Sequence, residues 1–236
     1  MATKQSFKAR LTPTQNQTFE ITGGGEHYNF VKILREGLQW QRSGDIQRAC
    51  QSRLDAVQRI EELLTEGEPI NLEWEHANSQ AALEIIHASA VDHFLIEDYE
   101  LSAAMLELLL ELDPEDHLEA VVLLGFNYIK LEEYDSYIEI EGDLSEKNPA
   151  RYILKLWYQY RQNQTLDKSA LQTLKSRFKA YFEEFTREEH PADESYLKDI
   201  ESATPSTEAS ARELWLKSEP LWLAEPQFIE LLKSSR

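Results

Sequence analysis

The chain has 236 residues and a formal net charge of -19, and 42% of its residues are hydrophobic. This hydrophobic content excludes disorder throughout the chain, and its eight glycines and eight prolines are few for an all-β fold with many turns. No stretch of roughly 18 consecutive apolar residues is present, so we expect no transmembrane helix and no membrane partner. Residues 1–5 lack the apolar run of a secretory signal, and Cys50 is the single cysteine. Both observations predict a cytoplasmic protein without disulfides.

The negative charge is concentrated in the middle of the chain. Residues 61–150 contain 24 Asp and Glu residues but only Lys130 and Lys147 as basic residues, whereas residues 1–60 carry a small positive excess. An acidic surface repels phosphate backbones, so we expect no nucleic-acid partner. The same surface would attract a basic protein segment. The alternative is that these charges only form a solvated face that keeps the chain in solution.

The first part of the chain changes from irregular to helical sequence. Residues 1–25 show no sustained hydrophobic period and end in three glycines, so we predict a flexible N-terminal arm with a short extended piece near 18–21. From about residue 26 the apolar residues recur at helical spacing. This pattern predicts helices over 27–42, 46–64, 71–96, 99–112, 116–131, 134–147, 150–163 and 167–186.

Beyond these helices the pattern becomes weaker. Residues 191–209 are polar, which predicts a linker or loop. Residues 210–236 carry helix-like apolar residues, but Pro220 and Pro226 are expected to divide this tail into short pieces. We expect the tail to cover the exposed end of the preceding helices as a capping segment. A dimer contact through the same apolar surface is the alternative.

One pair of predicted helices carries a recognisable motif. The run Leu124-Gly125-Phe126-Asn127-Tyr128 places a small residue and, three positions later, a large aromatic residue on one helix. A short polar break and a second aromatic residue follow in Glu133-Tyr134-Asp135, and Asn148-Pro149 closes the unit. This spacing resembles that of the tetratricopeptide repeat family.

Two earlier helix pairs share parts of the motif. Their small residues are Gly37 and Ala90, and the large residues three positions later are Trp40 and His93. The first pair lacks the closing proline, and an insertion separates it from the second. The resemblance implies an all-α, helical-hairpin repeat solenoid of about four hairpins, a right-handed superhelix over residues 26–190 with C-terminal capping helices.

In the resembled family, partners lie along the concave face formed by the first helix of each pair. Carried over by position, eight residues would contact a protein or peptide partner: Gln41, Arg42, Glu84, His87, Phe94, Glu119, Phe126 and Lys130. Two basic residues are too few for a clamp on a C-terminal carboxylate, and the mixture of acids and aromatic rings suits a basic or amphipathic segment. The alternative is that Phe94 and Phe126 are covered by neighbouring helices or by the tail.

Two Glu-x-x-His sequences, Glu73–His76 and Glu84–His87, form the competing pattern. This is the ligand spacing of di-iron bundles, but such sites need two facing helices, whereas both sequences fall on one predicted helix. We therefore predict no metal site, no cofactor and no catalytic residues. Cys50 is expected to be an inert thiol on an apolar helix face.

The sequence thus predicts a non-enzymatic scaffold or adaptor that binds a protein or peptide partner, with a basic segment as the favoured class. Two alternatives remain open. One is a metal-binding or catalytic helical protein that uses Glu and His of residues 71–96, and the other is a structural subunit of a stable complex. Monomer and homodimer are both compatible with the sequence.

Overall fold

The computed structural model describes residues 8–65 and 69–235, and most of this chain is α-helical, as the sequence predicted. The helices belong to two compact units, Met1–Leu124 and Gly125–Arg236, named unit 1 and unit 2. The boundary between them falls inside α5 (Ala120–Lys130). Each unit has its own set of buried apolar side chains.

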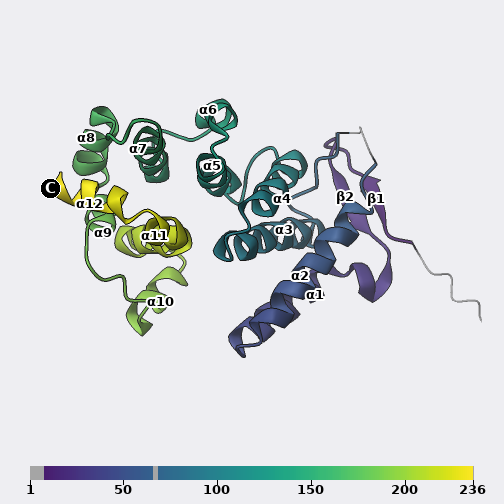
Figure 1. Cartoon of the computed structure of the whole chain (residues 1–236). Helices are drawn as coiled ribbons and strands as arrows, with labels where there is room; N and C mark the ends of the chain where they lie inside the picture. Colours follow the sequence, from purple (N-terminus) through teal and green to yellow (C-terminus); the bar gives the residue numbers. More distant parts are fainter. Residues whose placement is uncertain (1–7, 66–68, 236) are drawn as a thin grey trace, which may run out of the picture. The chain divides into compact units, whose positions relative to one another are not determined.

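Unit 1 combines a β-hairpin with helices that pack as neighbours. Its elements before α5 are β1 (Arg10–Pro13), β2 (Phe19–Thr22), the 3-10 helix η1 (Gly25–Tyr28), α1 (Phe30–Arg42), α2 (Ile46–Glu61), α3 (Ala77–Leu95) and α4 (Tyr99–Leu112). Helix α3 packs against α1, α2 and α4, and α1 also packs against α2 (Figure 1). The central position of α3 explains why most of its faces are apolar and buried.

The N-terminal segment differs from the flexible arm expected for residues 1–25, of which 1–7 lie outside the described chain. Strands β1 and β2 pair as an antiparallel hairpin, and β2 packs on α3. The side chain of Asn78 joins the two: its Nδ2 donates to the Ile21 carbonyl at 3.1 Å, and its Oδ1 accepts from the Phe30 backbone N–H at 2.8 Å. Strand β2 confirms the short extended piece predicted near 18–21. Helical periodicity could not reveal its pairing with β1, because the strands have four residues each.

Unit 2 continues from the second part of α5. Its further helices are α6 (Tyr134–Glu141), α7 (Pro149–Asn163), α8 (Lys168–Arg177), α9 (Lys179–Phe185), α10 (Glu194–Ile200), α11 (Thr207–Ala224) and α12 (Pro226–Ser234). Helix α6 ends at Glu141, six residues before the predicted end at 147. Three further features differ from the sequence prediction. The helix expected over 167–186 is broken at Phe178, the short helix α10 lies inside the expected linker 191–209, and Pro220 lies within α11.

An aromatic cluster forms the core of unit 2. Trp222 of α11 is 2% exposed. Its ring centroid lies between 5.4 and 5.8 Å from those of four other rings: Phe126, Trp157, Phe185 and Phe228. These four rings come from α5, α7, α9 and α12, so α11 is the helix around which the unit packs. Burial of Trp215 and Trp222 on either side of Pro220 offsets the backbone hydrogen bond that this proline removes from α11.

The turns α1–α2, α3–α4 and α5–α6 have the same geometry. One residue in each adopts the left-handed conformation: Gly44 (φ 82°), Glu97 (φ 65°) and Glu132 (φ 64°). The next residue donates its backbone N–H to the carbonyl five residues earlier, and all three N···O distances are 2.9 Å. The accepting residues are Trp40, His93 and Tyr128. The large residue of the sequence motif therefore marks a repeated helix C-terminal cap of the Schellman type.

Glycine at the two glutamate positions of these turns is expected to stabilise the chain. The left-handed conformation costs a residue with a Cβ about 1 kcal/mol that glycine avoids. Glu97→Gly should therefore raise the free energy of unfolding by about 0.5–1 kcal/mol, measured by urea denaturation. Glu132→Gly should raise it by less, because it also removes the hydrogen bond that Arg161 Nη2 donates to the Glu132 carboxylate at 2.8 Å. Ala104→Gly, on the exposed side of α4, is the control and should lower it by about 1 kcal/mol. Lower stability of both glutamate variants would contradict this prediction.

Candidate functional site

The structure divides the predicted partner-binding residues between the two units. Unit 1 contains Gln41, Arg42, Glu84, His87, Phe94 and Glu119, and unit 2 contains Phe126 and Lys130. The two phenylalanines require a correction: Phe94 is 0% and Phe126 is 1% exposed, so neither side chain is accessible to a partner. Phe94 packs on Tyr99, and Phe126 packs on Trp157 and Trp222. The structure therefore agrees with the alternative, in which neighbouring helices and the tail cover these rings.

A row of partly accessible residues runs along one face of α3. Gln80, Glu84, His87, Val91 and Leu95 are spaced four, three, four and four positions apart, which places them on one face. The first four are half-buried, and Leu95 is 46% exposed. Two of the predicted site residues, Glu84 and His87, therefore lie on the partly accessible face of α3.

A second row of partly exposed residues runs along α1. Leu34, Leu38 and Arg42 are four positions apart, and Leu38 is 45% exposed. Helices α1 and α3 pack against each other. The side chain of Arg53 binds Gln41 in the last turn of α1 and Asp92 in the last turn of α3. The C-terminal ends of the two helices therefore lie close together, and the helices run in the same direction. The two rows together are named the α1–α3 strip: Leu34, Leu38 and Arg42 with Glu84, His87, Val91 and Leu95.

Arg53 of α2 fixes these two helices through a buried ion pair. Its Nε and Nη2 donate to the two carboxylate oxygens of Asp92 at 2.7 and 2.8 Å, and its Nη1 donates to Gln41 Oε1 at 3.3 Å. The Arg53 side chain is 6% exposed. Burial would lower the pKa of Arg53, but the hydrogen bonds and the charge of Asp92 outweigh burial and raise that pKa. Gln41, predicted to contact a partner, is thus bound within the unit.

Glu84 is the acidic residue of the α1–α3 strip. Burial raises the pKa of this carboxyl group, and a hydrogen bond with the Gln80 side chain opposes the increase. No cation among the described residues contributes to this shift. A half-buried carboxylate has lost part of its hydration, which a cation or a further hydrogen bond can replace. Glu84 therefore offers a half-buried carboxyl group, with Gln80 as its hydrogen-bond partner, on a partly accessible surface.

Glu119 and Lys130 have different surroundings. Glu119 is exposed just before α5, with a left-handed backbone conformation (φ 52°). Lys130 Nζ lies 3.7 Å from Glu225 Oε1, at the junction of α11 and α12, and Arg161 Nη1 donates to the same oxygen at 2.7 Å. The C-terminal segment of the chain therefore covers the face of α5 that carries Phe126 and Lys130.

The two Glu-x-x-His sequences do not share one helix, contrary to the prediction. His76 precedes α3 and caps it, because its Nδ1 accepts from the Ser79 backbone N–H at 3.4 Å. Glu73 accepts a hydrogen bond from the Thr18 hydroxyl at 2.6 Å. Helix α3 therefore starts later than the helix predicted over 71–96. Within the described chain, no group of three or more His, Cys, Asp and Glu side chains is arranged to hold a metal ion.

A charged cluster in unit 2 was not predicted from the sequence. Glu184 is 4% exposed, and its carboxylate accepts hydrogen bonds from Arg187 at 2.8 Å, His190 at 2.8 Å and Arg212 at 3.0 Å. The His190 ring stacks on Trp215 with centroids 3.8 Å apart. Burial would raise the pKa of Glu184, but the hydrogen bonds from Arg212 and His190 and the arginine charges outweigh burial and lower that pKa. Local sequence patterns could not reveal a cluster whose members lie up to 28 positions apart.

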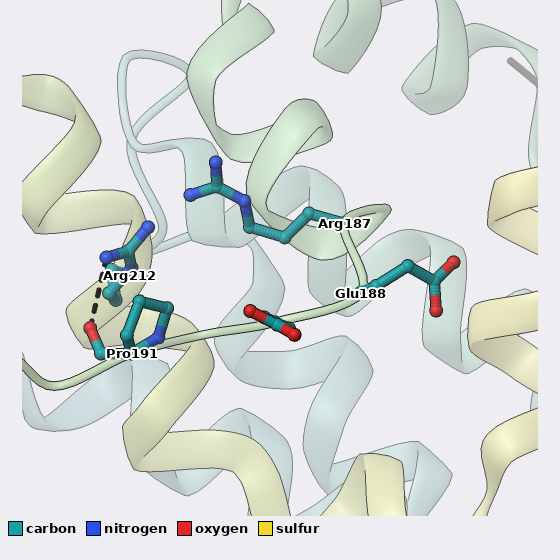
Figure 2. Close-up of a pocket in the computed structure, with 5 residues that line it drawn as sticks. Arg187, Glu188, Pro191 and Arg212 are labelled. Carbon is teal, nitrogen blue, oxygen red and sulfur yellow. Dashed lines mark hydrogen bonds between the residues drawn. The ribbon is translucent and has the colours of Figure 1, made fainter.

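An open pocket of about 350 Å³ lies beside this cluster (Figure 2). It is lined by Arg187, Glu188, Glu189, Pro191 and Arg212. Both arginines already donate to Glu184, and Arg212 Nη1 also donates to the Pro191 carbonyl at 3.0 Å, drawn as the dashed line in Figure 2. The arginines that line the pocket are thus bound internally, and acids lie beside them. We assign this cluster a structural role: it holds the segment after α9 on α11.

Glu184→Gln is expected to remove a pH-dependent contribution to stability. The pKa of Glu184 is lower in the folded than in the unfolded chain, so the contribution is complete above the unfolded value and is lost as the pH falls through the folded value. The difference in unfolding free energy between wild type and Glu184→Gln should therefore shrink as the pH falls from about 5 to about 3. Urea denaturation at each pH measures it, with the exposed Glu183→Gln as control. A difference that grows toward low pH would contradict the prediction.

No protein-family model, curated protein or solved structure matches this chain. In the part of the chain that the structure describes, no helix is both long and apolar enough to cross a membrane. A function for the α1–α3 strip is therefore inferred from its geometry and charge.

Proposed function

We propose that this chain is a scaffold of helical hairpins, similar to tetratricopeptide repeats, that binds a partner protein through the α1–α3 strip. The observation that carries the proposal is the exposure of Leu38 and Leu95, which lie on neighbouring helices and are each nearly half exposed. Large apolar side chains that are exposed on adjoining helices favour a contact with another protein. The three equivalent hairpin turns support the resemblance in fold.

Charge favours a basic partner. Helices α4 and α6 carry exposed acids: Glu100, Glu107, Glu111, Asp135 and Glu139. Acidic surfaces of this kind attract a basic segment and increase its association rate at low salt, whereas buried apolar contacts set its residence time. We infer that the acids steer the partner and that the α1–α3 strip holds it.

Affinity capture with a matched pair of variants tests this proposal. Wild-type protein and the double variant Leu38→Asp/Leu95→Asp serve as baits, and quantitative mass spectrometry compares the captured proteins. We expect a partner whose capture falls about tenfold or more with the double variant, because a carboxylate in an apolar contact costs at least about 1.4 kcal/mol. Leu197→Asp is the control, because Leu197 is a leucine of α10 in unit 2 that is 48% exposed.

Two further measurements accompany this experiment. Circular dichroism spectra should be the same and melting temperatures similar for all three proteins, because each substituted leucine is nearly half exposed and can turn a carboxylate toward water. Capture of the partner should also decrease as the salt concentration rises from about 0.05 to about 0.3 M, because salt screens the acidic surface. Equal capture by wild type and the double variant would overturn the α1–α3 strip as the docking surface.

A further inference from the structure

The C-terminal segment shows what covers an apolar helix face of this chain. In unit 2, α11 lies on the face of α5 that carries Phe126 and Lys130, with the rings of Trp222 and Phe126 5.8 Å apart between centroids. Glu225, which follows α11 directly, brings a carboxylate to Lys130 and to Arg161. The occupant of this face is thus a helix that supplies an apolar side chain to the apolar residues and a countercharge to the charged ones.

The α1–α3 strip also combines exposed apolar residues with a half-buried charged residue, but this residue is acidic, whereas Lys130 on α5 is basic. Leu38 and Leu95 supply the apolar surface, and Glu84 supplies a half-buried carboxylate. The cation of the strip, Arg42, lies at its other end, because α1 and α3 are aligned by Arg53 at their C-terminal turns. Glu84 precedes the aligned residue Asp92 by eight positions, about 12 Å along the helix axis. Arg42 is therefore too far away to compensate Glu84.

We propose that the occupant of the α1–α3 strip is a helix of a partner protein that presents a lysine or arginine to Glu84 and apolar side chains to Leu38, Val91 and Leu95. This inference rests on the proposed function and specifies the partner. Val91 and Leu95 follow Glu84 by seven and eleven positions, two and three helical turns. A partner helix that runs along α3 would therefore carry its basic residue seven and eleven positions from its apolar residues.

A library of displayed helical peptides about 18 residues long provides the probe. Each peptide has leucine at two fixed positions, four residues apart. A third position, seven residues from one leucine and eleven from the other, is randomised. The library contains this arrangement in both chain directions. The library is selected on full-length wild type, Glu84→Gln, Glu84→Lys and the control Glu111→Lys, an exposed position on α4. On wild type we expect lysine and arginine to be enriched about tenfold over aspartate and glutamate, because a basic side chain donates a charge-assisted hydrogen bond to the Glu84 carboxylate and an acidic one is repelled.

The variants separate this inference from the proposed function. The basic preference should disappear on Glu84→Gln, change to an acidic preference on Glu84→Lys, and persist on Glu111→Lys. Identical preferences on wild type and Glu84→Gln would overturn the inference. If the selected peptides require Leu38 and Leu95 but show no preference at the randomised position, the docking surface stands and this inference is wrong. If no peptide is selected, or if the peptides bind Leu38→Asp/Leu95→Asp as well as wild type, the proposed docking surface is wrong.

Discussion

The Trp222→Ala variant is expected to lose about 3–5 kcal/mol of the free energy of unfolding of unit 2. Trp222 is 2% exposed, and its ring contacts aromatic rings from α5, α7, α9 and α12. Removal of the indole leaves a cavity between four helices that pack from different directions. Because these helices cannot all move inward together, the cavity persists and its cost adds to the lost burial of the ring.

Urea denaturation followed by far-UV circular dichroism measures this effect. The unfolding transition should move to lower urea concentration, because unit 2 contains the whole cluster. Leu223→Ala is the control: Leu223 is the next residue but is 74% exposed, so its truncation should change stability by less than about 0.5 kcal/mol. A loss below about 1 kcal/mol for Trp222→Ala would mean that the surrounding rings close the cavity.

Local sequence chemistry predicted the helices whose ends are set by neighbouring residues. The helix expected over 99–112 has the same bounds as α4. Asp98 caps its start by accepting from the Leu101 backbone N–H, and Pro114 follows shortly after its end. The same holds for the three hairpin turns, because a helix cap is a contact among consecutive residues.

Contacts between distant residues limited the prediction of the site. Position in the repeat motif placed Phe126 and Lys130 on an accessible face, but Trp222 and Glu225 cover that face from the other end of the chain. No local pattern records such a contact. Glu84 stays half-buried on the edge of α3, and its lack of a cationic partner became visible only when the surrounding side chains were placed.

Asp92→Ala is expected to destabilise unit 1 by about 3 kcal/mol. The substitution leaves the guanidinium group of Arg53 buried, since this side chain is 6% exposed, and removes the carboxylate that accepts two of its hydrogen bonds. Gln41 cannot replace that carboxylate, because its amide oxygen carries no net charge. Urea denaturation measures the loss, and Glu111→Ala, an exposed acid on α4, should change stability by less than about 0.5 kcal/mol.

The double variant Arg53→Met/Asp92→Leu tests whether the lost stability comes from the pair or from the orphaned charge. We expect it to recover most of the loss of Asp92→Ala, because two apolar side chains avoid the desolvation cost that the ion pair only offsets. Recovery would mean that Arg53 contributes more to the alignment of α1 and α3 than to the stability of unit 1. It can align the two helices because it binds both Gln41 and Asp92. The α1–α3 strip would then lose partner affinity in a variant that remains stable. A double variant as unstable as Asp92→Ala would instead assign Arg53 and Asp92 to the stability of the unit itself.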